Sequence, residues 1–218
     1  MLRVAFKTAV NSTEASCDIQ YGYTRRPTHT NTNWDFARFE VAAHNYVDIS
    51  DANGGAALLN DCKYGYHLTC DTLDLNLLRS PTHPDYDADQ GEHLFTYSFL
   101  PHSGNLTSGD VMREGAMLNR PLTVIEGKAG LDIPFALSEI KNVSVGAVKK
   151  AEKSDDLIIR LVETNGTNGS VKLDFARPVT ITECNMIEWS DTQDIVKDSL
   201  SAELKFKPFE IRTLRIKR

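Results

Sequence analysis

Hydrophobic and polar residues alternate with a period of two in many short runs of this chain. That pattern places alternate side chains on one face of a β-sheet. The strongest run is residues 157–162, Leu-Ile-Ile-Arg-Leu-Val, which is largely apolar on both faces. Other alternating runs cover Arg38–Val41, Leu73–Leu77, Phe95–Phe99 and Val171–Phe175. The pattern predicts a mainly β protein built from short strands.

Turn-forming residues connect some of these runs. Residues 163–169 contain two Asn-Gly pairs, which tolerate the positive φ of tight turns, so we expect a hairpin between the runs at 157–162 and 171–176. Residues 204–216 predict one or two further strands. Pro208 has no N–H to donate to a neighbouring strand and therefore marks an edge, a bulge or a break.

One helix is expected, over residues 107–118, because Ser, Thr and Asp at its start can cap it and Asn119-Arg120-Pro121 can end it. Composition also changes here, since all six histidines precede it. We therefore expect a β domain over residues 1–105, a helical connection over 106–120, and a second β region over 121–218.

Two segments before the helix are too polar for strands, residues 23–35 and 80–91. Long ordered loops in compact β domains often carry function. A purely solvated loop is the alternative at both places, and composition does not decide between them.

Charge and hydropathy limit the kinds of partner that this chain is expected to bind. The chain has 218 residues, 24 of them Lys or Arg and 30 Asp or Glu, so its net charge is −6. That balance argues against binding along a nucleic-acid backbone, which needs a basic face. No apolar run approaches the ~20 residues that span a bilayer, so we expect no membrane partner.

Cysteine usage predicts a reducing compartment. Cys17, Cys62, Cys70 and Cys184 form no CxxC pair and are irregularly spaced, which disfavours a zinc ribbon and a disulfide framework. We expect Cys62 to pack as a small buried hydrophobe. The first twelve residues also lack the apolar run of a secretory signal.

Signatures of several kinds of active site are missing. No His-x-His or HExxH spacing is present, and the acidic segment from His83 to Asp89 does not follow the calcium-loop pattern. There is no GxSxG motif and no glycine-rich phosphate loop. Carbohydrate chemistry, which uses carboxylates with aromatic, Arg and Asn side chains, is better matched. Carboxylates are too numerous for the sequence to nominate a catalytic pair.

Several long segments resemble one family. They look like the C-terminal part of α-mannosidases of glycoside hydrolase family 38, in the cytosolic and bacterial subgroup. These segments follow the order of that family over nearly the whole chain: Gln20–Tyr23, Arg26–His29, Asn33–Val41, Ala43–His44, Ala57–Tyr66, Leu77–Pro81, Ala88–His93 and Lys207–Leu214. The resemblance implies an antiparallel β-sandwich, a portion of a galactose-mutarotase-like supersandwich, followed by a smaller terminal β-sandwich, with one short helix.

The resemblance also implies where catalysis occurs. In this family the nucleophilic and acid/base aspartates and the ligands of a divalent, zinc-like metal lie in an N-terminal domain, and nothing here matches its motifs. We therefore expect no catalytic residue, metal or cofactor in this chain. We expect it to be inactive alone, to pack on an N-terminal catalytic domain that acts on mannosides, and to be cytoplasmic. Exposure of the packing surface would also allow the chain to self-associate.

The residues at 57–66 are the best candidates for contact with substrate. A strand over 57–60 would deliver Asp61, Lys63 and Tyr64 to its end, and with Asn60 these form our predicted substrate-binding set. A cation and a carboxylate can hydrogen-bond sugar hydroxyls, and a tyrosine can pack on the ring. There are two alternatives to contact with substrate. Asp61 and Lys63 could instead form an ion pair at a domain interface, or the segment could have only a local role in a turn.

A second set is expected at the domain interface, namely Arg26, His29, Trp34 and Asp35. Two other functions stay open: a carbohydrate-binding sandwich that acts on its own, and a purely structural module. The structural module predicts a large exposed apolar patch where a missing domain would dock.

Overall fold

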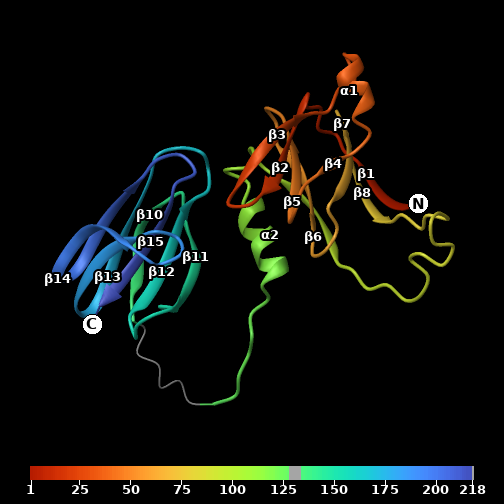
Figure 1. Ribbon diagram of the computed structural model, residues 1–218. Helices are drawn as coiled ribbons and strands as arrows, with labels where there is room; N and C mark the ends of the chain where they lie inside the picture. The colour runs from red at the N-terminus through yellow and green to blue at the C-terminus, as the bar shows by residue number, and fades with distance from the viewer. Residues whose placement is uncertain (128–133, 218) are drawn as a thin grey trace. The chain divides into compact units, whose positions relative to one another are not determined.

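The computed structural model describes residues 1–127 and 134–217 and confirms a mainly antiparallel β protein. The chain forms two compact units, residues 1–125 and 126–218, each treated separately below (Figure 1). The helix predicted as a connection packs within the first unit. No helix among the described residues has the length and apolar character needed to cross a membrane.

The first unit contains two antiparallel sheets. The four-stranded sheet has the order β1 (Leu2–Lys7), β8 (Thr72–Leu78), β7 (Gly65–Thr69) and β4 (Val41–Ala42). The five-stranded sheet has the order β3 (Gly22–Pro27), β2 (Glu14–Ile19), β5 (Tyr46–Ser50), β6 (Gly55–Asn60) and β9 (Tyr97–His102). Both sheets contribute to one core, which includes Val47, Ile49, Leu58, Leu73 and Leu75. The predicted alternation of Leu73, Leu75 and Leu77 is confirmed, since all three side chains are buried.

Helix α2 (Val111–Asn119) covers the other face of the five-stranded sheet. Leu59 of β6 joins Val111 in a second apolar cluster, while its neighbour Leu58 faces the main core. Strand β6 is therefore buried along its whole length. The predicted helix begins four residues later than expected, because Asp110 has a left-handed φ of 57° and its side chain makes no capping hydrogen bond. It pairs with Arg113 instead.

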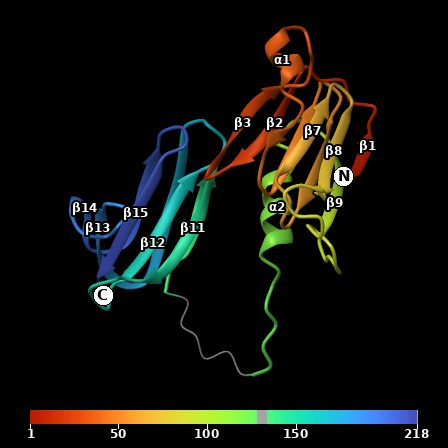
Figure 2. The same ribbon diagram turned by 45° about the vertical axis from the view of Figure 1, so that its right-hand side comes forward.

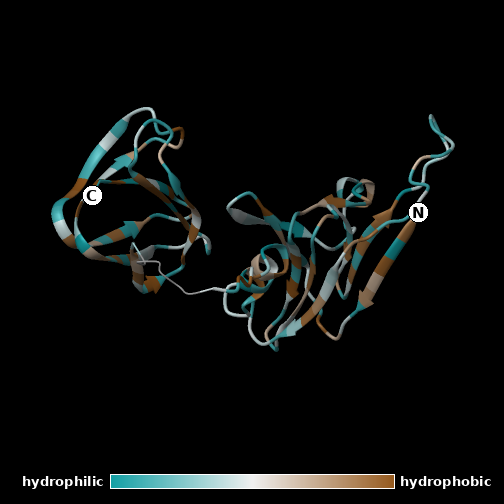
Figure 3. Ribbon diagram, turned by 90° about the horizontal axis from the view of Figure 1, so that it is seen from below, coloured by the Kyte–Doolittle hydropathy of each residue, from teal (hydrophilic) through white to brown (hydrophobic). Residues whose placement is uncertain are grey.

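The second unit is built around a long bent hairpin. Its strands are β10 (Ala136–Lys141), β11 (Val143–Lys150), β12 (Leu157–Glu163), β13 (Gly169–Cys184), β14 (Asp191–Phe206) and β15 (Ile211–Lys217). The first half of β13 pairs with β10 and the second half with β15, and β14 accompanies it throughout. Apolar and polar residues alternate along these strands (Figure 3), and the inward set includes Leu161, Leu173, Leu204 and Leu214.

The predicted hairpin at 163–169 is wrong. Strand β15 lies between β12 and β13, so the two runs are not neighbours in the sheet. The buried carboxylate of Glu163 explains the geometry: it accepts N–H bonds from Asn165 and Gly166, each at 2.9 Å, and from Phe209 at 2.9 Å. These bonds tie the loop to the turn at 207–210, which joins β14 to β15. The tail thus forms two strands broken at Pro208, as expected.

Three local predictions also need correction. Residues 22–27 form strand β3, although they were expected to be a loop, because pairing with β2 outweighs their polarity. Residues 38–40 precede strand β4 and are not part of it. A second helix, α1 (Asn33–Ala37), exists beside the single one expected. The long loop predicted at 80–91 is confirmed, since residues 79–96 contain no helix or strand.

Candidate functional site

A groove in the first unit brings three of the family-like segments together. It has a volume of about 690 Å³ and lies between the β6–β7 turn (residues 61–64), the end of β8 and the loop that follows β8. Its lining comes from residues 62–65, residues 76–79, Pro81, His83, Asp89 and His93. Segments distant in the sequence therefore share one concave surface.

Asn60 fixes the shape of the β6–β7 turn. It is 1% exposed, and its side-chain oxygen accepts the backbone N–H groups of Cys62 (3.0 Å) and Lys63. Its amide nitrogen donates to the His44 carbonyl (2.9 Å) and to the Tyr66 hydroxyl. Every polar atom of this side chain is thus engaged within the protein. In this chain Asn60 positions its neighbours, and a direct sugar contact by Asn60 stays a prediction.

The residues that follow Asn60 reach the surface. The predicted strand over 57–60 is part of β6, so Asp61, Lys63 and Tyr64 come at its end, as expected. Tyr64 is 59% exposed and stands edge-on to His44, with ring centroids 5.4 Å apart. The ammonium of Lys63 lies 5.0 Å from the centroid of the Phe95 ring. A cation and an aromatic face are therefore held at the groove.

The carboxyl of Asp61 is ionised readily. A hydrogen bond with the side chain of Cys62 holds the pKa of Asp61 below its ordinary value. Cys62 is exposed, so the expectation of a buried, packing cysteine is wrong. The reason is its place in a turn beyond the end of the buried strand. The structure records no ion pair between Asp61 and Lys63 among the described residues.

The opposite wall of the groove has an unsatisfied acceptor. The side-chain oxygen of Asn76 is buried and has no hydrogen-bond partner within the described part of the chain. Asp89 anchors the adjoining loop, because it accepts the N–H of Ser80 at 2.8 Å while its carbonyl meets the His93 ring at 2.9 Å. Asn76 was not predicted as a site residue from the sequence. Its position between Leu75 and Leu77 in the alternating run indicated only a strand residue on the polar face.

The predicted interface residues lie mostly around α1, which stands off the sheets of the first unit (Figures 1 and 2). Thr32 and Asp35 form a reciprocal capping box, and Asp35 also pairs with His29 at 3.6 Å. The hydrogen bond from Thr32 lowers the pKa of Asp35. Trp34 is 85% exposed. Arg26 lies apart, on β3, where its charge opposes the effect of burial that raises the pKa of Cys17 to about 11.

Two further aromatic residues belong to the same surface. Phe36 and Phe39 are 64% and 69% exposed and contact each other edge-on at 6.0 Å. With Trp34 they form the aromatic surface of α1, and no residue of α1 is buried. The spacing of aromatic residues in Asn33–Phe39 was the available signal, which the sequence analysis did not use for Phe36 and Phe39.

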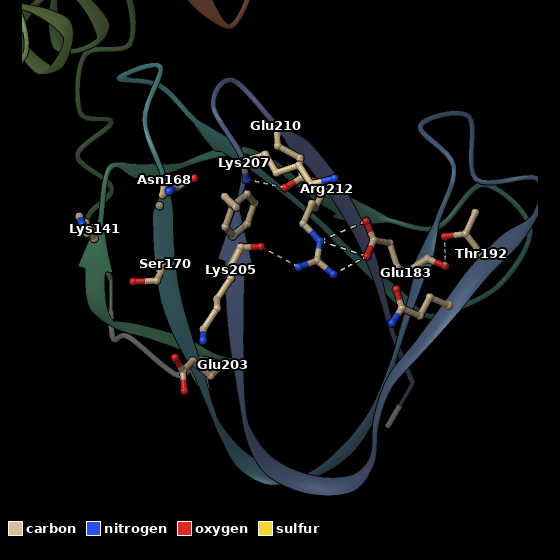
Figure 4. Close-up of a pocket in the computed structure, with 13 residues that line it drawn as sticks. Lys141, Asn168, Ser170, Glu183, Thr192, Glu203, Lys205, Lys207, Glu210 and Arg212 are labelled. Atoms are coloured by element: carbon tan, nitrogen blue, oxygen red, sulfur yellow. Dashed lines mark hydrogen bonds and ion pairs between the residues drawn. The ribbon is translucent and has the colours of Figure 1, made fainter.

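A second groove, of about 820 Å³, lies on the terminal unit (Figure 4). Arg212 and Glu183 form a bidentate pair at its centre, with N–O distances of 3.1 and 3.0 Å from the guanidinium Nε. Arg212 also donates to the Lys205 carbonyl at 3.2 Å. The groove is polar and mixed in charge, with Lys205 and Glu203 along one side.

Neither groove gathers metal ligands. Among residues 1–127 and 134–217, no group of three or more His, Cys, Asp or Glu side chains could hold a metal ion. The described residues therefore form no site that fits the zinc-like metal implied by the resemblance.

Comparison with known proteins identifies the family. The model of the glycosyl hydrolases family 38 C-terminal domain matches residues 1–87, and that of the family 38 C-terminal beta sandwich domain matches residues 142–214. The chain belongs to the C-terminal region of glycoside hydrolase family 38. The predicted family is thereby confirmed.

The relatives of this family 38 region are long enzymes. Alpha-mannosidase G of Dictyostelium discoideum is 39% identical and human alpha-mannosidase 2C1 is 38% identical, over 99% and 98% of this chain. The chain spans about a fifth of their length, 21% in both cases. The fold also matches a crystal structure of an α-mannosidase from Enterococcus faecalis V583, with a TM-score of 0.77 and 23% identity over 98% of this chain and 25% of that one.

These comparisons confirm the fold and the family but assign no site residue. Two sets of residues stay predictions. The predicted substrate contacts are Asp61, Lys63 and Tyr64, and the predicted interface residues are Arg26, His29, Trp34 and Asp35. The structure adds that Lys63 and Tyr64 line one groove and that Asp61 lies in the same turn. Of the other four, Trp34 and Asp35 lie on α1, and His29 pairs with Asp35.

Proposed function

We propose that this chain completes an α-mannosidase by packing on a catalytic domain and lining its sugar pocket. The observation that carries the proposal is the meeting of three family-like segments in the groove of the first unit. The similarity to alpha-mannosidases over nearly the whole chain supports the reaction class. The catalytic carboxylates and the zinc-like divalent metal would belong to the catalytic domain.

The groove suits a mannoside by its chemistry. Lys63 offers a donor for sugar hydroxyls, and the exposed ring of Tyr64 can pack on the apolar face of a pyranose. Asp61, in the same turn beside the groove, would offer an acceptor. Asn60 holds the turn in place through the hydrogen bonds described above.

The aromatic surface of α1 supports packing on another domain. Trp34, Phe36 and Phe39 are large and exposed, and the capping box orders them in advance. Aromatic residues are enriched at the buried centres of protein interfaces. The four free cysteines support a reducing, cytoplasmic location.

The test is hydrolysis of a chromogenic α-mannoside by the full-length protein and by this chain alone. We expect activity in the full-length protein only. There, Lys63→Met and Asp61→Asn should each raise KM about tenfold, because a hydrogen bond to a charged group contributes about 1.5–3 kcal/mol. Lys7→Met is a matched control, since Lys7 is 80% exposed on β1.

Each outcome has a distinct meaning. Hydrolysis by this chain alone would overturn the accessory role and direct the search for catalytic carboxylates to the first unit. Normal kinetics in both groove variants would remove the sugar-lining role while leaving the packing role in place.

The polar groove of the terminal unit favours a second candidate, binding of carbohydrate by the isolated chain. Titration of this chain with mannosides tests it. Chemical-shift changes at Lys205 and Arg212 would support it, and an unchanged spectrum would exclude it.

A further inference from the structure

The loop joining β13 to β14 (residues 185–190, the 185–190 loop) presents apolar side chains to solvent. Met186 is 51% exposed, Ile187 is 56% exposed and Trp189 is 70% exposed. These three residues are here called the apolar tip. Nothing in the groove of the first unit or in α1 involves them, so they stand outside the sites described above.

The backbone of this loop is held closely. The side-chain oxygen of Asn185 accepts the N–H of Trp189 at 2.8 Å, and the N–H of Asn185 donates to Ser190 at 3.0 Å. Glu188 adopts a left-handed φ of 63°, a conformation that a non-glycine residue keeps only where its surroundings enforce it.

Distant residues secure the same loop. The carboxylate of Glu188 is buried and accepts the Lys149 ammonium at 2.8 Å and the Glu152 N–H at 2.9 Å. Arg160 donates to the Met186 carbonyl and Arg215 to the Glu188 carbonyl, each at 2.8 Å. Three cations from strands β11, β12 and β15 thus hold the backbone and the buried carboxylate of a loop whose apolar side chains are exposed.

This arrangement has the properties of a preformed contact surface. Ordering a loop before it binds removes part of the entropic cost of association. The Glu188 carboxylate is neutralised within the unit, and the exposed Lys153 ammonium lies 5.2 Å from the centroid of the Trp189 ring. The apolar tip therefore offers hydrophobic area beside one positive charge. Such a surface suits an apolar patch of another protein surface better than it suits a charged ligand or a sugar.

We propose that the apolar tip is a docking surface for the part of the enzyme that lies outside this chain. The proposal rests on the proposed function and assigns the terminal unit its own point of attachment, separate from α1. The partner is argued from length: relatives that match this chain almost end to end carry about four fifths of their residues elsewhere.

The two tryptophans of the chain provide the test, because Trp34 lies on α1 and Trp189 on the apolar tip. Hydroxyl-radical footprinting with mass spectrometry measures oxidation of each residue in this chain and in the full-length protein. We expect oxidation of Trp189 to fall about tenfold in the full-length protein, because residues at an interface core lose nearly all of their accessible surface. Met117, which is 55% exposed on α2 and lines neither groove, is the internal reference.

The outcomes separate this proposal from the one before it. Protection of Trp34 without Trp189 would overturn the apolar tip and leave the packing role intact. Equal oxidation of both tryptophans in both proteins would overturn both. Protection of Trp189 that grows with the concentration of this chain alone would assign the tip to a second copy, which also overturns the proposal.

A variant gives an independent measurement. Trp189→Ser should leave the melting temperature of this chain unchanged, because the side chain is largely exposed, and should lower that of the full-length protein. An equal effect in both proteins would identify a role within the terminal unit and contradict docking.

Discussion

The two tryptophan-bearing segments are ordered in different ways. Helix α1 is held by residues close to it in sequence: Thr32 and Asp35 cap each other, and His29 and Arg38 pair with Asp35. The 185–190 loop is held by residues from other strands, among them Lys149 and Arg215. One exposed aromatic surface therefore depends on local hydrogen bonds and the other on the assembled sandwich.

The difference predicts different modes of opening. A five-residue helix without buried side chains can fray while the sheets stay folded, because local opening costs less than global unfolding where few buried contacts are lost. The 185–190 loop shares its partners with β11, β12 and β15. We expect it to loosen only when those strands are perturbed or when its own buried carboxylate is changed.

The largest effect is expected from Glu188→Gln. Lys149 and the Glu152 N–H donate to different oxygens of the Glu188 carboxylate, and glutamine replaces one of these oxygens with an NH2 donor. We therefore expect the free energy of unfolding of the terminal unit to fall by about 1–3 kcal/mol. Thermal unfolding followed by NMR of residues in each unit measures it. Asp194→Asn is the control, because its ion pair with Lys197 is exposed and should contribute little. Equal loss in both variants would contradict a special role for Glu188.

A smaller and more local effect is expected from Thr32→Ala. Loss of the cap should destabilise α1 by about 1 kcal/mol. Amide hydrogen exchange should accelerate at Asp35 and Phe36, whose N–H groups bond to Thr32, and stay unchanged in β6. Thr30→Ala, two residues earlier and exposed, should have no effect. Faster global unfolding or altered exchange in β6 would show that α1 is coupled to the core.

The smallest effect is expected on acidification. Asp35 has a pKa below its ordinary 3.8 because it accepts hydrogen bonds from Thr32. A carboxyl with a lowered folded-state pKa stabilises the fold when ionised, so its contribution is present above 3.8 and is lost as the pH falls through the lower value. Fluorescence of Trp34 in a Trp189→Phe chain should report this loss. In the Thr32→Ala variant, the pH midpoint of the fluorescence change should rise towards 3.8. An unchanged midpoint would exclude the hydrogen bond from Thr32 as the cause of the lowered pKa.

The sequence predicted the elements whose pattern is local and strong. Alternation marked β8, β12 and the first half of β13, and the apolar run before Asp61 marked the end of β6. The candidate groove was predicted in part, since Asp61, Lys63 and Tyr64 follow that strand. Its opposite wall, with Asn76, depends on which strand lies beside which turn.

Errors occurred where pairing across the sheet outweighed local preference. Residues 22–27 are polar but form β3 because β2 lies beside them. The Asn-Gly turn at 165–166 was taken for a hairpin, whereas the buried Glu163 binds the loop to a turn 46 residues away. Cys62 is small and apolar, yet its position beyond the end of β6 leaves it exposed.

By itself, the sequence determined the β class and the family, because alternation and long matching segments can both be seen in neighbouring positions of the chain. Only the tertiary structure decided the order of strands in the terminal unit and which segments line the groove beside Tyr64. It also decided which side chains hydrogen-bond to the 185–190 loop. These features depend on side chains that meet across tens of residues, and the burial that makes such contacts strong exists only after the chain has folded.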